Sequence, residues 1–88
     1  ILDVKPKSEG HTLIITKKHY RNLLDMPTTL GNELIAAAKE ISLRLVKEGK
    51  AEGFNLIINN ESAAGQVVFH THIHIIPRKI GDRLRGIV

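Results

Sequence analysis

Three histidines occupy alternate positions in the segment FHTHIHIIPRK, at His70, His72 and His74. Because successive side chains of a β-strand point to opposite faces, a strand here places the three imidazoles on one face at intervals of about 6.6 Å. Protonated imidazoles in a row repel one another, and buried neutral ones need partners for both ring nitrogens. A purely structural role is therefore disfavoured, and the segment predicts a site of chemistry.

Two kinds of chemistry fit this spacing. Histidines at positions i and i+2 of a strand can bind a metal ion, but no Asp, Glu or Cys lies in the strand to complete a site. The outer two histidines also lie about 13 Å apart by strand rise. Alternatively, one neutral imidazole is a nucleophile and its neighbours orient it and bind an anion, since imidazole titrates near pH 6.5. Attack on phosphorus would then give a phosphohistidine-type intermediate that water cleaves.

The segment before the histidines favours a phosphate-bearing substrate. The loop Ala63-Ala64-Gly65-Gln66 contains small residues that let backbone N–H groups approach phosphate oxygens and form an anion-binding nest. This loop lies between two apolar segments that are typical of strands, at positions 54–59 and 67–76. We expect these two strands to pair as an antiparallel hairpin, with Pro77 ending the second one.

Two further elements must hold this hairpin. The segment HTLIIT, at positions 11–16, predicts a third strand, and positions 17–27 predict a short helical turn. A helix is predicted from Thr28, capped by Thr28 or Thr29 and ended by Gly49. It carries one apolar stripe, formed by Leu30, Leu34, Ala38, Ile41 and Leu45. The hairpin residues opposite the histidines are expected to face this helix, namely Phe69, Thr71, Ile73 and Ile75.

Composition limits the class of protein. A chain of 88 residues is at most one domain, and 42% hydrophobic residues is ordinary for a soluble globular fold. The absence of cysteine excludes disulfides and thiolate metal sites. No apolar run approaches a membrane span and no signal peptide is visible, so we expect no membrane partner and a cytoplasmic location. The net charge of +4 suits phosphate-bearing partners. Only 3% of the residues are aromatic, so the chain has few side chains on which bases could stack, and we do not expect a nucleic-acid partner.

The sequence resembles the histidine-triad (HIT) family. HTHIHII followed by PRK is similar to the family signature, H-x-H-x-H and two apolar residues. LDVKPKSEGHTLIITKKH and INNESAAGQVVFHTHIHIIPR resemble two further family segments in the expected order. The resemblance covers nearly the whole chain and implies an α+β fold, a mainly antiparallel sheet with one long helix. We expect residues 1–88 to be a HIT domain that lacks the N-terminal strand and helix of the family.

The resemblance also implies an activity, hydrolysis at the α-phosphate of nucleoside phosphoramidates, adenylylated conjugates or dinucleoside polyphosphates. His72 would be the nucleophile and would be nucleotidylated. His74 and His11 would contact the phosphate oxygens, and His70 would orient the network. His19 is interpreted as a surface residue outside the site.

Other expectations from the resemblance concern the substrate, cofactors and partners. Residues expected to bind a purine nucleotide are Asp3 at the ribose, Ile1 and Val4 at the base, and Asn59, Gly65 and Gln66 at the phosphate and leaving group. The chemistry would need no metal, and a structural zinc would belong only to an N-terminal region absent from this sequence. A homodimer is expected, consistent with the apolar breadth of positions 34–46.

One residue departs from the family pattern, and two alternatives stay open. Several family members carry Ser or Thr where this chain has Val67, and a hydroxyl there can assist the departing group. A valine cannot, so the leaving group is left undetermined. The alternatives are a nucleotide-binding module without turnover and a metal-dependent hydrolase that uses His70 and His72.

Overall fold

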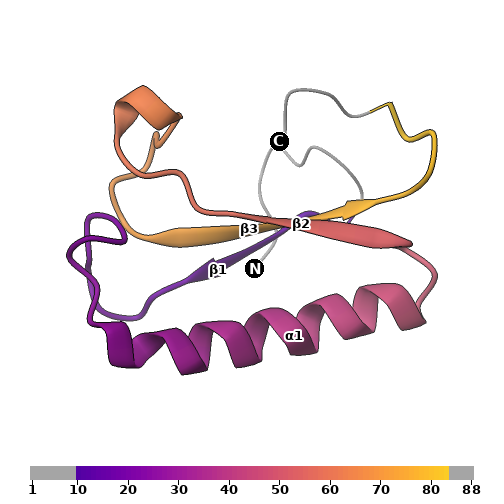
Figure 1. Ribbon diagram of the computed structural model, residues 1–88, viewed down its shortest axis with the longest axis horizontal. Helices are drawn as coiled ribbons and strands as arrows, with labels where there is room; N and C mark the ends of the chain where they lie inside the picture. Colours follow the sequence, from indigo (N-terminus) through magenta and orange to yellow (C-terminus); the bar gives the residue numbers. More distant parts are fainter. Residues whose placement is uncertain (1–9, 84–88) are drawn as a thin grey trace.

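This computed structural model describes residues 10–83 of the chain. They form a three-stranded antiparallel sheet and one long helix (Figure 1). Strand order in the sheet is β1-β3-β2, and α1 lies along one face of the sheet. This is the predicted α+β architecture. The elements in chain order are β1 (Thr12–Ile15), the 3₁₀ turn η1 (Thr28–Leu30), α1 (Gly31–Lys47), β2 (Gly53–Ile57), the 3₁₀ turn η2 (Ser62–Ala64) and β3 (His72–Arg78).

Strand β3 lies at the centre of the sheet and determines where the histidines lie. It pairs antiparallel with β2, which confirms the predicted hairpin, and on its other side it pairs antiparallel with β1. In the β1 register, Leu13 lies opposite His74 and Ile15 lies opposite His72. The strand that follows His11 is thus brought directly beside the histidine-bearing strand, although the two are far apart in the sequence.

Alternation from His72 to Ile75 separates a packed face of β3 from the face that carries the histidines. Ile73 and Ile75 are 5% and 0% exposed, whereas His72 and His74 are half-buried. Ile75 forms a core cluster with apolar residues of α1 and the loop after it, namely Ala38, Leu45 and Ala51. Because period-two alternation places every second residue on the same face, one strand supplies both the core and the site.

The ends of α1 agree only in part with the sequence prediction. The helix is entered through Pro27 and the turn η1, and no side-chain cap bond from Thr28 or Thr29 forms, so the predicted threonine cap is wrong. Pro27 has no N–H to satisfy and its fixed φ suits a helix start. At the other end the prediction is confirmed, since Gly49 adopts φ 75° and its N–H donates to the carbonyl of Val46 at 3.1 Å.

Strand β3 begins later than predicted. The predicted strand starts at position 67, whereas β3 starts at His72. The Thr71 N–H donates to the Tyr20 carbonyl at 2.7 Å, and the Thr71 hydroxyl donates to the same oxygen at 2.9 Å. The chain before β3 is therefore held by the loop after β1. His70 consequently lies in a bend, and the prediction that it shares a strand with His72 and His74 is wrong.

Strand β3 also continues through Pro77 to Arg78, where the sequence predicted an end. Pro77 pairs with Phe54 of β2, but pairing with β1 extends only to Ile75. A proline removes a donor from a ladder and is tolerated where no further rung forms. Among the described residues, the last β1 pair joins Thr12 to Ile75, and Pro77 follows two residues later.

No helix between residues 10 and 83 is long and apolar enough to cross a bilayer. The 17-residue helix α1 carries charged residues along its length, including Glu33, Lys39, Glu40 and Arg44.

Ile75→Ala tests the core assignment. Ile75 is fully buried between β1, β2 and α1. Its truncation leaves a cavity, so the free energy of unfolding should fall by about 2–5 kcal/mol. Urea denaturation followed by circular dichroism measures this change. Leu24→Ala is the control, because Leu24 is 89% exposed and its truncation should change stability by less than about 0.5 kcal/mol. Equal, small losses in both variants would contradict the assignment.

Candidate functional site

Three of the predicted histidines meet on the polar face of the sheet. The rings of His72 and His74 are neighbours on β3, with centroids 5.0 Å apart and an edge-to-face angle of 68°. His11, directly before β1, is 1% exposed, and its Nε2 lies 3.0 Å from Nδ1 of His74. The pairing of β1 with β3 is what brings His11 beside His74.

The hydrogen bonds of His72 determine which of its nitrogens is free to react. Its Nδ1 lies 2.7 Å from the backbone carbonyl of His70. A carbonyl oxygen only accepts, so Nδ1 carries the proton. In the neutral ring, Nε2 then holds the lone pair. The arrangement can supply a base or a nucleophile at Nε2, with the Nδ1–H bond fixing the orientation of the ring.

His70 is fixed in the opposite tautomer. Its Nε2 lies 2.6 Å from the carbonyl of Thr16 and 3.1 Å from the Thr16 hydroxyl, so Nε2 is the donor. Its Nδ1 lies 3.3 Å from Nδ1 of His19, and the two rings meet edge to face. In neutral His70, Nδ1 accepts, and His19 is then the donor. His70 thus touches His72 through its backbone carbonyl and not through its ring.

His19 is the residue that sequence reasoning missed. The sequence predicts a surface residue, and His19 is exposed, yet its ring contacts His70. A signal was present in the sequence, because the segment LDVKPKSEGHTLIITKKH that resembles the family ends on His19 itself. Proximity to His70 depends on how the loop after β1 folds back, which no local pattern indicates.

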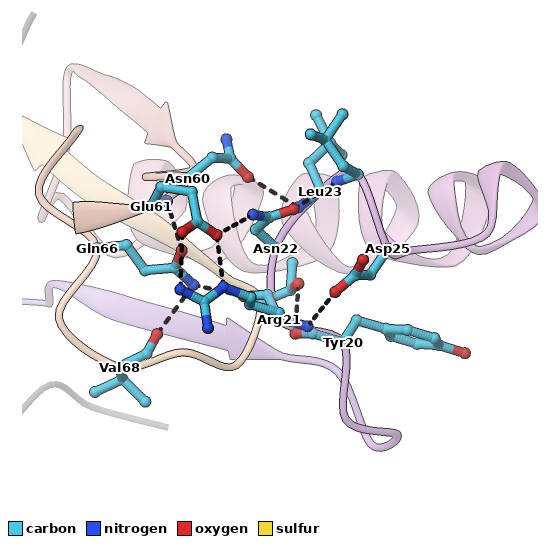
Figure 2. Close-up of polar contacts among 11 residues, drawn as sticks. Tyr20, Arg21, Asn22, Leu23, Asp25, Asn60, Glu61, Gln66 and Val68 are labelled. Carbon is cyan, nitrogen blue, oxygen red and sulfur yellow. Dashed lines mark hydrogen bonds and ion pairs between the residues drawn. The ribbon is translucent and has the colours of Figure 1, made fainter. Parts of the chain in front are cut away.

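A polar network braces the loop that precedes β3 (Figure 2). Arg21 donates from Nε and Nη2 to the two carboxylate oxygens of Glu61 at 2.7 and 2.8 Å, and Asn22 Nδ2 donates to Glu61 as well. Asn60 Oδ1 accepts from the N–H of Leu23 at 2.8 Å. The loop after β1 and the loop before β3 are therefore joined at several points.

Glu61 has an unusual backbone for a residue with a side chain. Its φ of 71° and ψ of 161° lie in a region that is essentially confined to glycine. Holding a non-glycine residue there costs on the order of 1–3 kcal/mol, which surrounding contacts must offset. The guanidinium of Arg21, chiefly through its hydrogen bonds, lowers the pKa of the Glu61 carboxyl, and the same bonds raise the pKa of Arg21.

Gln66 and Gly65, predicted to contact the substrate, are both engaged within the protein. Gln66 is 4% exposed, its Nε2 donates to the carbonyls of Arg21 and Val68, and its Oε1 accepts from the Glu61 N–H. Gly65 adopts φ 88°, and its N–H donates to the carbonyl of Ser62 at 3.0 Å. Phosphate contacts by these groups stay a prediction, and they require existing hydrogen bonds to be shared.

The other predicted binding residues are located as follows. Asn59 is half-buried and lies two residues beyond the end of β2. Ile1, Asp3 and Val4 lie outside the described residues.

Beside the histidines, an apolar hollow of about 320 Å³ is lined by Leu13, Ile15, Val68, His70 and His72. Its size lies at the lower end of the range typical of small-molecule pockets. Among residues 10–83, no group of three or more His, Cys, Asp or Glu side chains is arranged to hold a metal ion.

Comparison with known proteins places this site in context. The Arabidopsis thaliana adenylylsulfatase HINT3 is 50% identical over 84 residues, which are 96% of this chain and 43% of that protein. A zinc-bound histidine triad family protein from Mycobacterium smegmatis superposes with a TM-score of 0.90 at 38% identity, over 97% of this chain and 62% of that one. A hypothetical histidine triad nucleotide-binding protein from Sulfolobus tokodaii gives a TM-score of 0.85 at 46% identity, over 92% and 54%.

These relatives are longer than this chain, which spans about half of their length. The family model described as the HIT domain matches residues 1–81. The match includes all five histidines and both braced loops, and it agrees with the α+β fold and the histidine geometry. The chain belongs to the HIT family.

Proposed function

We propose that this chain hydrolyses nucleotidyl conjugates at the α-phosphate, with Nε2 of His72 as the nucleophile. The observation that carries the proposal is the hydrogen bond from His72 Nδ1 to the His70 carbonyl, which leaves the lone pair on Nε2. The resemblance to a nucleotide-binding protein and an adenylylsulfatase of the same family supports a nucleotide substrate.

The reaction would proceed in two displacements. In the first, the His72 Nε2 lone pair forms a bond to the α-phosphorus, and the leaving group departs with the electron pair of its bond to phosphorus. Positive charge then develops on the ring, and the Nδ1–H bond to the His70 carbonyl becomes charge-assisted and stronger. In the second, water attacks phosphorus and releases a proton to the solvent, and the electrons of the N–P bond return to Nε2. The products are a nucleoside monophosphate and regenerated His72.

The neighbouring histidines would stabilise the phosphate during both displacements. His74 lies beside His72 on the same face, and it is hydrogen-bonded to the buried His11. Imidazole N–H groups aimed at the phosphate oxygens are worth most in a site that excludes water. Asp3 with Ile1 and Val4 would bind the ribose and a purine base. The bond cleavage would need no metal ion.

The site favours a leaving group that departs as the anion of a strong acid. An amine must be protonated to depart, whereas sulfate departs as an anion. Val68 lines the hollow beside His72, and Val67 stands where several family members have Ser or Thr. They are 61% and 86% exposed, and neither offers a proton. Together with the adenylylsulfatase relative, this favours adenylyl sulfate as the first substrate to test, ahead of a phosphoramidate or a dinucleoside polyphosphate.

His72→Ala tests the mechanism. With adenylyl sulfate as substrate, loss of the nucleophile should reduce the rate of AMP release by more than the roughly 10²–10⁴-fold typical of losing acid–base help alone. Mass spectrometry of the rapidly quenched wild-type protein should show an adenylylated peptide containing His72. Excess chelator should leave the rate unchanged.

Arg44→Ala is the control, because Arg44 is on the exposed side of α1 and pairs only with Glu40 among the ion pairs described there. Nucleotide binding without turnover by the wild-type protein would favour the binding-module alternative. Loss of turnover in chelator would favour the metal-dependent alternative.

We also propose that the chain forms a homodimer through α1 and β2. An apolar groove of about 560 Å³ runs between them, and β2 is an edge strand of the described sheet. Five large apolar side chains along the groove are 44–56% exposed: Ile35, Leu43, Val46, Phe54 and Leu56. A contiguous apolar surface beside an edge strand is typical of an interface.

Leu43→Glu tests the dimer. A charge in the centre of an apolar interface leaves a buried carboxylate without a partner, so the dimer should dissociate. Light scattering after size exclusion would show the mass change from two chains to one. Leu24→Glu, at an 89% exposed position in the loop before α1, should keep the wild-type mass. A wild-type protein that is monomeric at high micromolar concentration would contradict the proposal.

A further inference from the structure

We propose that Arg21 and Glu61 are positioning residues for His72, acting as a clamp on both ends of the loop that precedes β3. The inference rests on the proposed function only in its kinetic part, because the orientation of the His72 ring can be measured without turnover. We define the Arg21–Glu61 clamp as this ion pair together with the contact of Arg21 on Phe69.

One side chain touches both ends of the loop. Glu61 lies at the start of the loop, and it receives two hydrogen bonds from the Arg21 guanidinium at 2.7 and 2.8 Å (Figure 2). Phe69 lies at the end of the loop, next to His70, and its ring centroid is 4.4 Å from Cζ of Arg21. A planar guanidinium can bind a carboxylate with two N–H groups and stack on an aromatic ring at the same time.

Backbone groups of the same residues complete the connection. The carbonyl of Arg21 accepts from Gln66 Nε2 at 2.6 Å, and Gln66 Oε1 accepts from the N–H of Glu61 at 2.6 Å. Gln66 is 4% exposed, so its amide is largely shielded from solvent. Arg21, Glu61 and Gln66 therefore form a closed ring of hydrogen bonds between the two loops.

The strained backbone of Glu61 indicates that the ring has a function. A φ of 71° with ψ of 161° persists in a non-glycine residue only where the surroundings fix it, and such residues cluster at functional sites. A glycine would reach this conformation freely but would have no carboxylate for Arg21. Here Arg21 binds the carboxylate of Glu61 and Gln66 binds its N–H, and together these contacts hold the strained backbone.

Phe69, the last residue of the clamp, directly precedes His70, whose carbonyl orients the His72 ring. That carbonyl accepts the His72 Nδ1–H at 2.7 Å. A shift of that carbonyl would lengthen this bond and let the other His72 tautomer form, with its proton on Nε2. The stability of the fold should depend little on the pair, since Arg21 and Glu61 are 51% and 45% exposed.

The first experiment measures the tautomer of His72 in the free protein. Imidazole ¹⁵N NMR, assigned with His72→Gln, should show wild-type His72 protonated at Nδ1 and bare at Nε2. In Arg21→Ala and in Glu61→Gln the two ¹⁵N shifts should move toward each other, because both tautomers become populated. Arg44→Ala is the matched control, since it removes a 2.8 Å ion pair of comparable exposure that lies on α1.

The second experiment measures turnover of adenylyl sulfate. Small displacements of a reacting group cost up to about 10²-fold in rate, so kcat should fall about 10- to 100-fold in Arg21→Ala while KM changes less than about twofold. The Arg21→Ala/Glu61→Gln double variant should be no slower than the slower single variant, because the two residues act as a unit. Arg21→Lys, which keeps the charge but not the paired N–H groups, should give an intermediate rate.

Three results would overturn the inference. The first is that the ¹⁵N shifts of His72 in Arg21→Ala match those in Arg44→Ala, and the second is that the losses in the double variant are additive. A thermal midpoint that falls far below that of Arg44→Ala would also count against a positioning role, since it would assign the pair to the fold. If wild-type protein shows no adenylylated peptide but the His72 tautomer shifts in Arg21→Ala, the proposed function fails and the clamp stands.

Discussion

The site depends on one hydrogen bond, between the His72 ring and the His70 carbonyl. Imidazole has two nitrogens of nearly equal basicity, and only a fixed partner decides which one carries the proton. Here the partner is a backbone group, which can accept but never donate. The side chain can then change charge during a reaction without changing the direction of this bond. The remaining architecture holds that carbonyl in place: the central strand on one side, and the braced loop on the other.

Local patterns were sufficient to predict the elements but not the connections between loops. The apolar stripe of α1, Gly49 at its end, and the alternation of histidine and isoleucine on β3 follow from backbone periodicity, and the structure has all three. The start of β3 was predicted wrongly because Thr71 bonds to Tyr20, 51 residues away in the chain. Propensity describes a residue and its neighbours, and a contact at that separation competes with it successfully.

In the candidate site, too, the sequence predicted the residues better than the contacts between distant loops. His11, His72 and His74 converge as the resemblance implied, and the pairing of β1 with β3 explains their proximity. Contact of Gln66 with the substrate stays a prediction, and the structure adds that its amide joins two loops. The sequence indicates which residues matter to the site. It does not distinguish a side chain that contacts a ligand from one that positions another residue. Glu61 and Arg21 illustrate this most clearly, because neither has a feature that separates it from ordinary surface charges.

Strand β3 places Ile73 and Ile75 on its packed face and His72 and His74 on the opposite face, one residue apart. A shift of one residue in its pairing would exchange the two sets, burying imidazoles against Leu45 and exposing isoleucines to water. The misaligned sheet would therefore be penalised twice, by lost apolar burial and by imidazoles without partners. The alternation that brings His72 and His74 to one face thus also fixes the register of this strand. A mispaired chain would lose its stability together with the arrangement of its histidines.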